Sequence, residues 1–79
     1  MKYLSVFYDI PTQFGADKEL DDQIERIAEQ LGCDWDGCGS GFNRRDCGFE
    51  APDTLTQADA EKAFSLIRHR LAGIELEDV

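Results

Sequence analysis

Three cysteines and one histidine are the residues of this 79-residue sequence that metal or nucleophile chemistry would use first. Cys33, Cys38 and Cys47 follow a C-x4-C-x8-C spacing, and His69 lies far along the chain. A structural zinc site needs four closely spaced ligands, so we predict no metal centre, and no cofactor. The odd number of cysteines favours free thiols in a reducing compartment. Cys38 and Cys47 are expected to face each other across a hairpin, which would make oxidation in vitro possible.

Two short motifs resemble ligand-binding loops but lack the residues that such loops need. The glycine-rich run 37–41 leads into a strand, whereas phosphate-binding glycine loops lead into a helix N-terminus. The segment 34–37 begins like a calcium loop. Cys38 and Arg45, however, occupy positions where that loop requires oxygen ligands. Neither motif predicts an anion or cation site.

The sequence also contains few residues that could act as catalytic groups. His69 stands between Arg68 and Arg70 in the last turn of an expected second helix, where cations favour the helix dipole without any chemistry. Carboxylates are abundant, but none stands out against an apolar wall that would raise its pKa. We therefore predict a protein that is not an enzyme.

Size and charge limit the remaining classes. The sequence carries 17 acidic against 8 basic residues, a formal net charge of −9, and its length predicts one domain spanning 1–79. Direct nucleic-acid binding is disfavoured, because phosphate contacts depend on Lys and Arg. No apolar stretch is long enough to cross a membrane. Asp9 and Pro11 also interrupt the N-terminal apolar run too early for a signal peptide. We expect a cytoplasmic protein.

Periodicity predicts an α+β fold. Residues 2–10 are rich in β-branched and aromatic residues, as in a central strand, and 11–15 break it. Leu20, Ile24, Ile27 and Leu31 form a helix stripe between an Asp17 N-cap and a Gly32 stop. The later expected elements are a strand at 33–38, a turn at 39–41, a strand at 45–51, a second helix from Thr56 to Leu71 and an optional strand at 74–76. This β-α-β-β-α(-β) order is typical of a ferredoxin-like antiparallel sheet with both helices on one face.

Acidic residues are concentrated in one part of the chain. Residues 9–36 contain nine acids against Lys18 and Arg26, a local net charge of −7. Asp17, Asp21, Glu25 and Glu29 are spaced four apart, so they stack into one ridge on the first helix. Like charges at this spacing destabilise a helix by roughly 0.2–0.5 kcal/mol per pair. The ridge is thus either a solvated face or, with Asp22, Asp34 and Asp36, a docking surface for a basic partner.

The open face of the sheet is a second candidate surface. If Leu4, Val6 and Tyr8 point under the helices, then Tyr3, Ser5, Phe7 and Asp9 line the other face. Four acids of the hairpin are expected to join them: Asp34, Asp36, Asp46 and Glu50. An aromatic centre with an acidic rim suits a protein interface. The simpler alternative is that Tyr3 and Phe7 pack against a tail or a second copy of the chain.

The whole-chain build resembles the small acidic phage-encoded anti-CRISPR inhibitors. The resemblance rests on size, acidity and the succession of KYLSVFYDI, an acidic helix and the hairpin CDWDGCGSGFNRRDCGFE. It implies binding to the crRNA-guided surveillance complex of a type I CRISPR system and blockage of target DNA. The residues that carry it are Asp17, Asp21, Glu25, Glu29, Asp34 and Asp36. Arg44, Arg45, Arg68 and Arg70 depart from a uniformly acidic DNA mimic.

Three functions therefore remain open from the sequence. The first is a non-catalytic inhibitor whose acidic patch binds a basic, nucleic-acid-binding surface. The second is a small regulatory or assembly subunit that dimerises, or binds a protein partner, through its open sheet face. The third is a small ligand-binding or catalytic domain, which would need a concave pocket holding a perturbed carboxylate.

Overall fold

The structure is a computed structural model that describes residues 1–10 and 16–79; the predicted break at 11–15 lies outside the described residues. Seven elements follow in chain order: β1 (Lys2–Asp9), α1 (Lys18–Gln30), β2 (Asp34–Gly41), β3 (Arg44–Ala51), α2 (Gln57–Ala63), a short 3-10 helix (Arg68–Arg70) and β4 (Gly73–Asp78). The predicted α+β class is confirmed, and the optional last strand exists.

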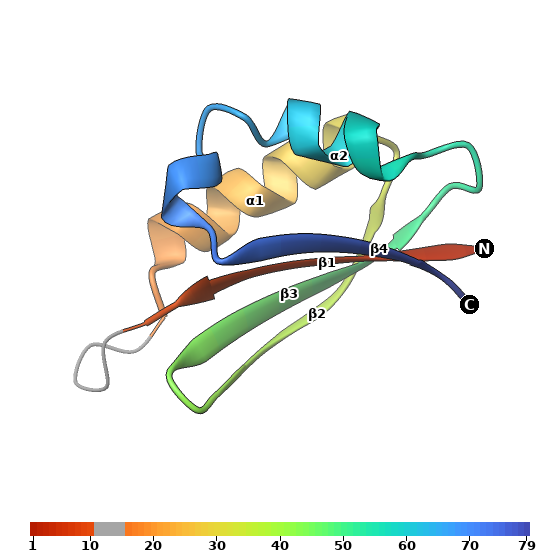
Figure 1. Cartoon of the computed structure of the whole chain (residues 1–79). Coiled ribbons are helices and arrows are strands. Elements are labelled where there is room, and N and C mark those ends of the chain that lie inside the picture. The colour runs from red at the N-terminus through yellow and green to blue at the C-terminus, as the bar shows by residue number, and fades with distance from the viewer. Residues whose placement is uncertain (11–15) are drawn as a thin grey trace.

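The four strands form one antiparallel sheet in the order β2-β3-β1-β4. Strands β1 and β3 are central, and β2 and β4 are the edges. Both helices cover the same face of the sheet, which leaves the other face open (Figure 1). The molecule thus has two layers, and every strand residue faces either the helices or the open side. No helix within the described ranges is long and apolar enough to cross a bilayer.

The hydrophobic core lies between the sheet and the helix layer, and includes Ala60 and Phe64 from α2 and its C-terminal end. Leu4, Val6 and Tyr8 of β1 are at most 2% exposed, as the alternation predicts. From α1, Leu20 and Ile24 enter the same core, and further members of the predicted stripe pack against its edge. Burial of this helix face fixes α1 across the central strands.

Capping residues set the helix limits where the sequence places them. The Asp17 carboxylate accepts a hydrogen bond from the Leu20 backbone N–H at 3.1 Å, so Asp17 is the N-cap of α1. Gly32 has φ +80° and ends that helix in the left-handed conformation that glycine tolerates. Thr56 caps α2 by accepting a hydrogen bond from the Asp59 N–H at 3.1 Å.

The predicted length of the second helix is wrong. Helix α2 ends at Ala63, and residues 64–71 continue as turns and a 3-10 helix, with i→i+3 bonds such as Ile67 N–H to Phe64 C=O. The chain must then enter the sheet edge, where the Ala72 N–H bonds to the Phe7 carbonyl at 2.8 Å. His69 therefore lies in the 3-10 helix and not in the last turn of α2.

The predicted position of the hairpin turn is also wrong. Gly39, Ser40 and Gly41 belong to β2, and the turn is the pair Phe42 and Asn43, with φ +52° and +64°. Two positive φ values are the pattern of a two-residue turn whose twist matches the flanking strands. The strand pairing Gly41↔Arg44 fixes this tight turn.

Candidate functional site

Aromatic rings occupy the centre of the open sheet face, as predicted for Tyr3 and Phe7. Both residues alternate with the buried side chains of β1. The Tyr3 ring lies over Gly48 of β3 and the Phe7 ring over Gly73 of β4, where a Cβ atom would overlap with either ring. The two glycines therefore let the rings lie flat on the sheet. Sequence reasoning missed this role, although a glycine inside a strand is a known signal for close approach.

Carboxylates lie beside these rings on the neighbouring strands. Strand pairing places Glu50 and Glu77 on either side of Tyr3, Asp46 beside Phe7 and Glu75 beside Ser5. The sequence predicts the last strand only as an option, so it does not place Glu75 and Glu77 on the open face. Within residues 1–10 and 16–79, strand pairing and the bond to Tyr3 place seven acids on the open face: Asp9, Asp34, Asp36, Asp46, Glu50, Glu75 and Glu77.

One of these carboxylates is bound to the aromatic centre. The Tyr3 hydroxyl donates a hydrogen bond of 2.7 Å to Asp36 Oδ2. This bond, with desolvation and the negative charges of Asp36 and Glu50, raises the pKa of Tyr3 to about 12. The contact joins β1 to the edge strand β2 across β3, so Tyr3 is held in place before any partner binds.

Arg44 is the basic residue that strand pairing places on this face. Its guanidinium carbon lies 4.8 Å from the centroid of the Phe7 ring, and its Nε lies 3.5 Å from Asp9 Oδ1. A cation over an aromatic face is an attractive arrangement. Arg44 therefore lies at the hairpin end, and the charged side chains that strand pairing places beside Tyr3, among the described residues, are the acids Glu50 and Glu77.

The predicted acidic patch of residues 9–36 is divided between two surfaces. Asp34 and Asp36 lie on the open face, whereas the ridge of α1 lies in the helix layer on the other side (Figure 1). Asp34 and Asp36 thus lie on the open face with Tyr3 and Phe7, as the sequence predicts for these two acids, and not on one surface with the ridge. The reason is the side-chain alternation of β2, which directs Asp34 and Asp36 away from the helices.

The first two acids of the α1 ridge form ion pairs with basic residues of this chain. Asp17, besides capping the helix, accepts a hydrogen bond from Arg70 Nη2 at 2.9 Å. Asp21 is only 17% exposed and forms an ion pair of 3.1 Å with Arg45, which is itself partly buried. These two carboxylates hold α1 against the 3-10 helix and β3. They are structural, which the four-residue spacing alone does not reveal.

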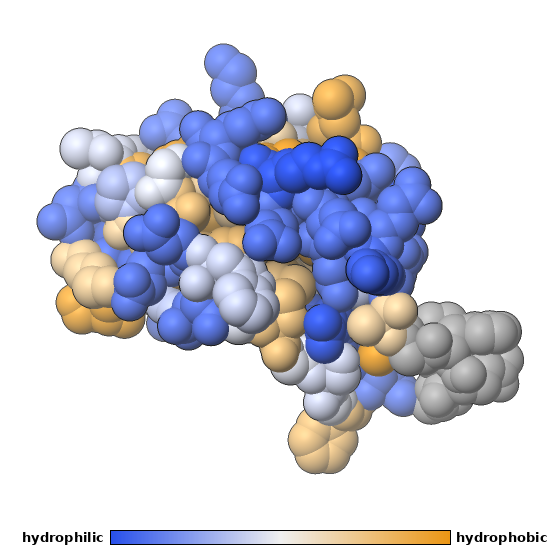
Figure 2. Space-filling view, turned by 180° about the vertical axis from the view of Figure 1, so that it is seen from behind, coloured by the Kyte–Doolittle hydropathy of each residue, from blue (hydrophilic) through white to orange (hydrophobic). Residues whose placement is uncertain are grey.

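The other acids of α1 remain on the surface. Asp22 and Glu29 are exposed, Glu25 is half-buried, and no ion pair with them is found in the part of the chain that is described. The face of the molecule seen in Figure 2 is mostly hydrophilic, with apolar side chains in scattered patches.

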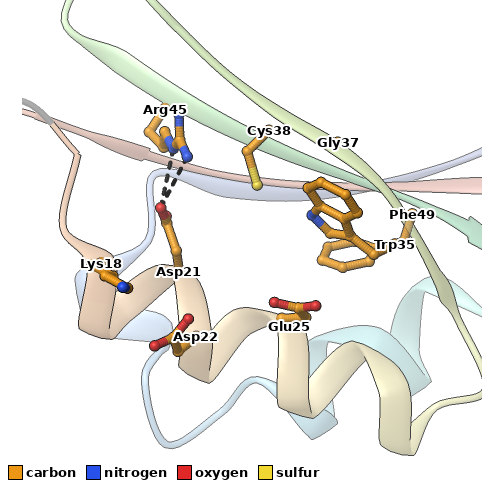
Figure 3. A pocket seen from close by; sticks show the side chains of 9 residues that line it. All are labelled: Lys18, Asp21, Asp22, Glu25, Trp35, Gly37, Cys38, Arg45 and Phe49. Atoms are coloured by element: carbon orange, nitrogen blue, oxygen red, sulfur yellow. Dashed lines mark hydrogen bonds and ion pairs between the residues drawn. The ribbon is translucent and has the colours of Figure 1, made fainter.

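An open groove of about 410 Å³ separates α1 from strands β2 and β3. Trp35, 56% exposed, forms one wall, and the Glu25 carboxylate faces it from the helix (Figure 3). The Asp21–Arg45 ion pair and the Cys38 thiol lie at the other end (Figure 3). The sequence predicts that Trp35 lies in a strand, but it does not predict that the ring is exposed beside α1.

Cys38 and Cys47 face each other across the hairpin, with their Sγ atoms 2.8 Å apart. Cys33 is buried at the junction between α1 and β2. Among residues 1–10 and 16–79, no three His, Cys, Asp or Glu side chains come together in a way that could hold a metal ion.

Comparison with known proteins gives no relative: no family model, no curated protein and no solved structure matches this chain.

Proposed function

We propose that this protein is a non-catalytic inhibitor that binds a basic, nucleic-acid-binding surface of another protein. The observation that carries the proposal is the open sheet face, where, among the described residues, seven carboxylates share the face with Tyr3 and Phe7 and Arg44 lies at the hairpin end. Interfaces commonly combine an aromatic centre with a polar rim. A partner with clustered Lys and Arg side chains complements this rim.

Nucleic-acid-binding surfaces are the natural partners for such a face. They hold phosphates with Lys and Arg, and release of counterions drives that association. A protein that presents carboxylates to the same side chains competes with the nucleic acid. The remaining acids of α1, the exposed Asp22 and Glu29 and the half-buried Glu25, offer a second acidic surface, with carboxylates about 6 Å apart where the spacing is four residues.

The partner class that we propose is the effector complex of a type I CRISPR system, as the resemblance to anti-CRISPR inhibitors implies. Blocking its target-DNA site would require action in the host cytoplasm. The acidic open face supports this choice, because a protein surface that binds duplex DNA is lined with Lys and Arg and is complementary in charge to this face.

We also assign the fold to the ferredoxin-like class. The β2-β3-β1-β4 order, the antiparallel pairing and the two helices on one face support this assignment. In such a fold the face opposite the helices is available to partners, which agrees with the proposed interface.

The charge of the face argues against the alternative of a homodimer through the open sheet. In a two-fold interface the same patch meets itself, so the acids of one copy would oppose those of the other. Like-charge contacts of this kind destabilise association. An assembly role with a different, basic partner stays compatible with the face.

A competition assay tests the proposal. Labelled target duplex is bound to a purified type I surveillance complex, and the protein is added over a salt series. We expect displacement of the duplex that weakens with salt, because exposed charges are screened within about 10 Å at 0.1 M salt.

Matched variants locate the interface. Glu50→Lys with Glu77→Lys reverses the two acids beside Tyr3, and should raise the inhibitory concentration at least about tenfold. Asp59→Lys, an exposed position on α2, is the control and should have little effect. Unchanged inhibition by the double variant would refute the open-face interface, and loss of inhibition with Glu25→Lys alone would assign the interface to α1.

A further inference from the structure

The pair Cys38 and Cys47 is arranged for covalent bonding. The two residues are directly opposite each other on β2 and β3, and their Sγ atoms are 2.8 Å apart. Opposite residues of antiparallel strands have Cα atoms about 4.5–5.5 Å apart, which is within the range that disulfides span. A disulfide bond is about 2.05 Å long, so a small rotation of the side chains closes the pair without moving the strands.

The two thiols differ in accessibility. Cys38 is half-buried and lines the groove beside α1 (Figure 3), whereas Cys47 is 1% exposed. The groove is open to solvent and large enough, at about 410 Å³, to admit a small molecule to the Cys38 sulfur. Cys38 is therefore the thiol that an external reagent meets first, and Cys47 is placed to react only with Cys38.

We propose that Cys38 and Cys47 form a thiol–disulfide exchange site, whose oxidant is a low-molecular-weight disulfide of the glutathione type. Cys38 loses its proton to solvent, and its thiolate attacks one sulfur of the oxidant, which forms a mixed disulfide and releases one thiolate. Cys47 then loses its proton to solvent and attacks the Cys38 sulfur, which forms the cross-strand disulfide and releases the second thiolate. Both cysteines are oxidised, and one small disulfide is reduced to two thiols. This chemistry does not depend on the identity of any protein partner.

The surroundings of Cys47 control the second step. In the reduced protein, burial, the hydrogen bond with Cys38 and the nearby charge of Asp21 on α1 raise the pKa of the Cys47 thiol, and Arg45 of β3 opposes this rise; burial and the two charged neighbours remain when Cys38 carries the mixed disulfide. The Asp21 Oδ1 atom lies 3.8 Å from the Cys47 sulfur, and the paired residue on β1 is the apolar Val6. Because the thiolate is the nucleophile, we expect the mixed disulfide on Cys38 to close faster as the pH rises.

Redox titration with mass mapping tests the site. The intact protein is equilibrated in glutathione buffers of increasing oxidised fraction, quenched with acid, alkylated under denaturing conditions and digested. We expect the alkylated thiols to fall from three to one, with Cys33 remaining and the peptides of Cys38 and Cys47 linked. Three alkylated thiols at every buffer composition, or a disulfide that joins two chains, would overturn the proposal.

Variants separate the two steps. In Cys47→Ala the resolving thiol is absent, so glutathione should remain attached to Cys38, whereas Cys33→Ser is the control and should still form the linked peptide. An adduct on Cys33 in place of Cys38 would contradict the assigned order. The mapping of the unaltered chain is decisive by itself if the Cys47 variant does not fold, because it requires no substitution.

Discussion

The hydroxyl of Tyr8 on β1 donates a hydrogen bond of 2.6 Å to Oδ1 of Asp21 on α1. The other carboxylate oxygen of Asp21 accepts from Arg45 on β3, so one side chain joins the helix to both central strands. Burial, followed by the bond to Asp21, raises the pKa of Tyr8 above its ordinary value. Asp21 therefore fixes α1 over the sheet, and its contribution is to stability.

Replacing this carboxylate should destabilise the protein. In Asp21→Asn the partly buried Arg45 loses its charged partner, and we expect the free energy of unfolding to fall by about 2 kcal/mol. The neighbouring Asp22→Asn is the matched control, and a surface change of this kind costs about 0.5 kcal/mol or less. Urea denaturation monitored by Trp35 fluorescence measures both. Equal effects would show that the Asp21 contacts do not stabilise the fold.

The hydrogen bond from Tyr3 to Asp36 predicts that the Tyr3 hydroxyl titrates at a higher pH than a free tyrosine. Tyr3 has a raised pKa of about 12 in the folded protein against 10.0 in the unfolded chain. The associated stability is complete below pH 10 and is lost as the pH rises through 12. In Asp36→Asn one tyrosine should titrate nearer about 10, as read from tyrosinate absorbance, and Asp34→Asn should leave both tyrosines unchanged. If the tyrosine titration is the same in Asp36→Asn as in the unaltered protein, the hydrogen bond between Tyr3 and Asp36 is contradicted.

Gly48 lies beneath the Tyr3 ring and should tolerate substitution less well than Gly39. In Gly48→Ala the new methyl group displaces the ring, which breaks the bond to Asp36 and costs about 1 kcal/mol. Gly39→Ala is the control on the same hairpin, because a Cβ there meets no atom within 4 Å. Denaturation and tyrosinate absorbance should both change in the first variant alone. A normal Tyr3 titration in Gly48→Ala would show that the ring does not need this space.

Oxidation of Cys38 and Cys47 should stabilise the hairpin. The bond closes a loop of ten residues, for which the chain-entropy relation gives about 3 kcal/mol. The midpoint of urea unfolding should therefore be higher for the oxidised protein than for the reduced one. Adding the same oxidant to Cys38→Ser is the control, and a rise in its midpoint would trace the effect to another group.

Local patterns predicted much of this fold. The helix stripe from Leu20, the Asp17 cap and the Gly32 stop could be read from spacing, because each depends on neighbouring residues. The alternation of β1 likewise separated Leu4, Val6 and Tyr8 from the open face. These features need no knowledge of the rest of the chain.

Features that depend on distant segments could not be predicted. Helix α2 ends early because the following residues must join the sheet beside Phe7. The turn falls at Phe42 and Asn43 because strand pairing, and not glycine content, fixes its place. The four-residue spacing places Asp21 among the ridge acids, and only its contacts with Tyr8 and Arg45 show its role in the fold. The tertiary arrangement decided each of these outcomes.

Strand β1 belongs to both surfaces of this two-layer molecule. Phe7 points to the open face and the next residue, Tyr8, points into the core toward Asp21. A single peptide unit therefore separates the Phe7 ring on the open face from the Tyr8–Asp21 hydrogen bond that fixes α1.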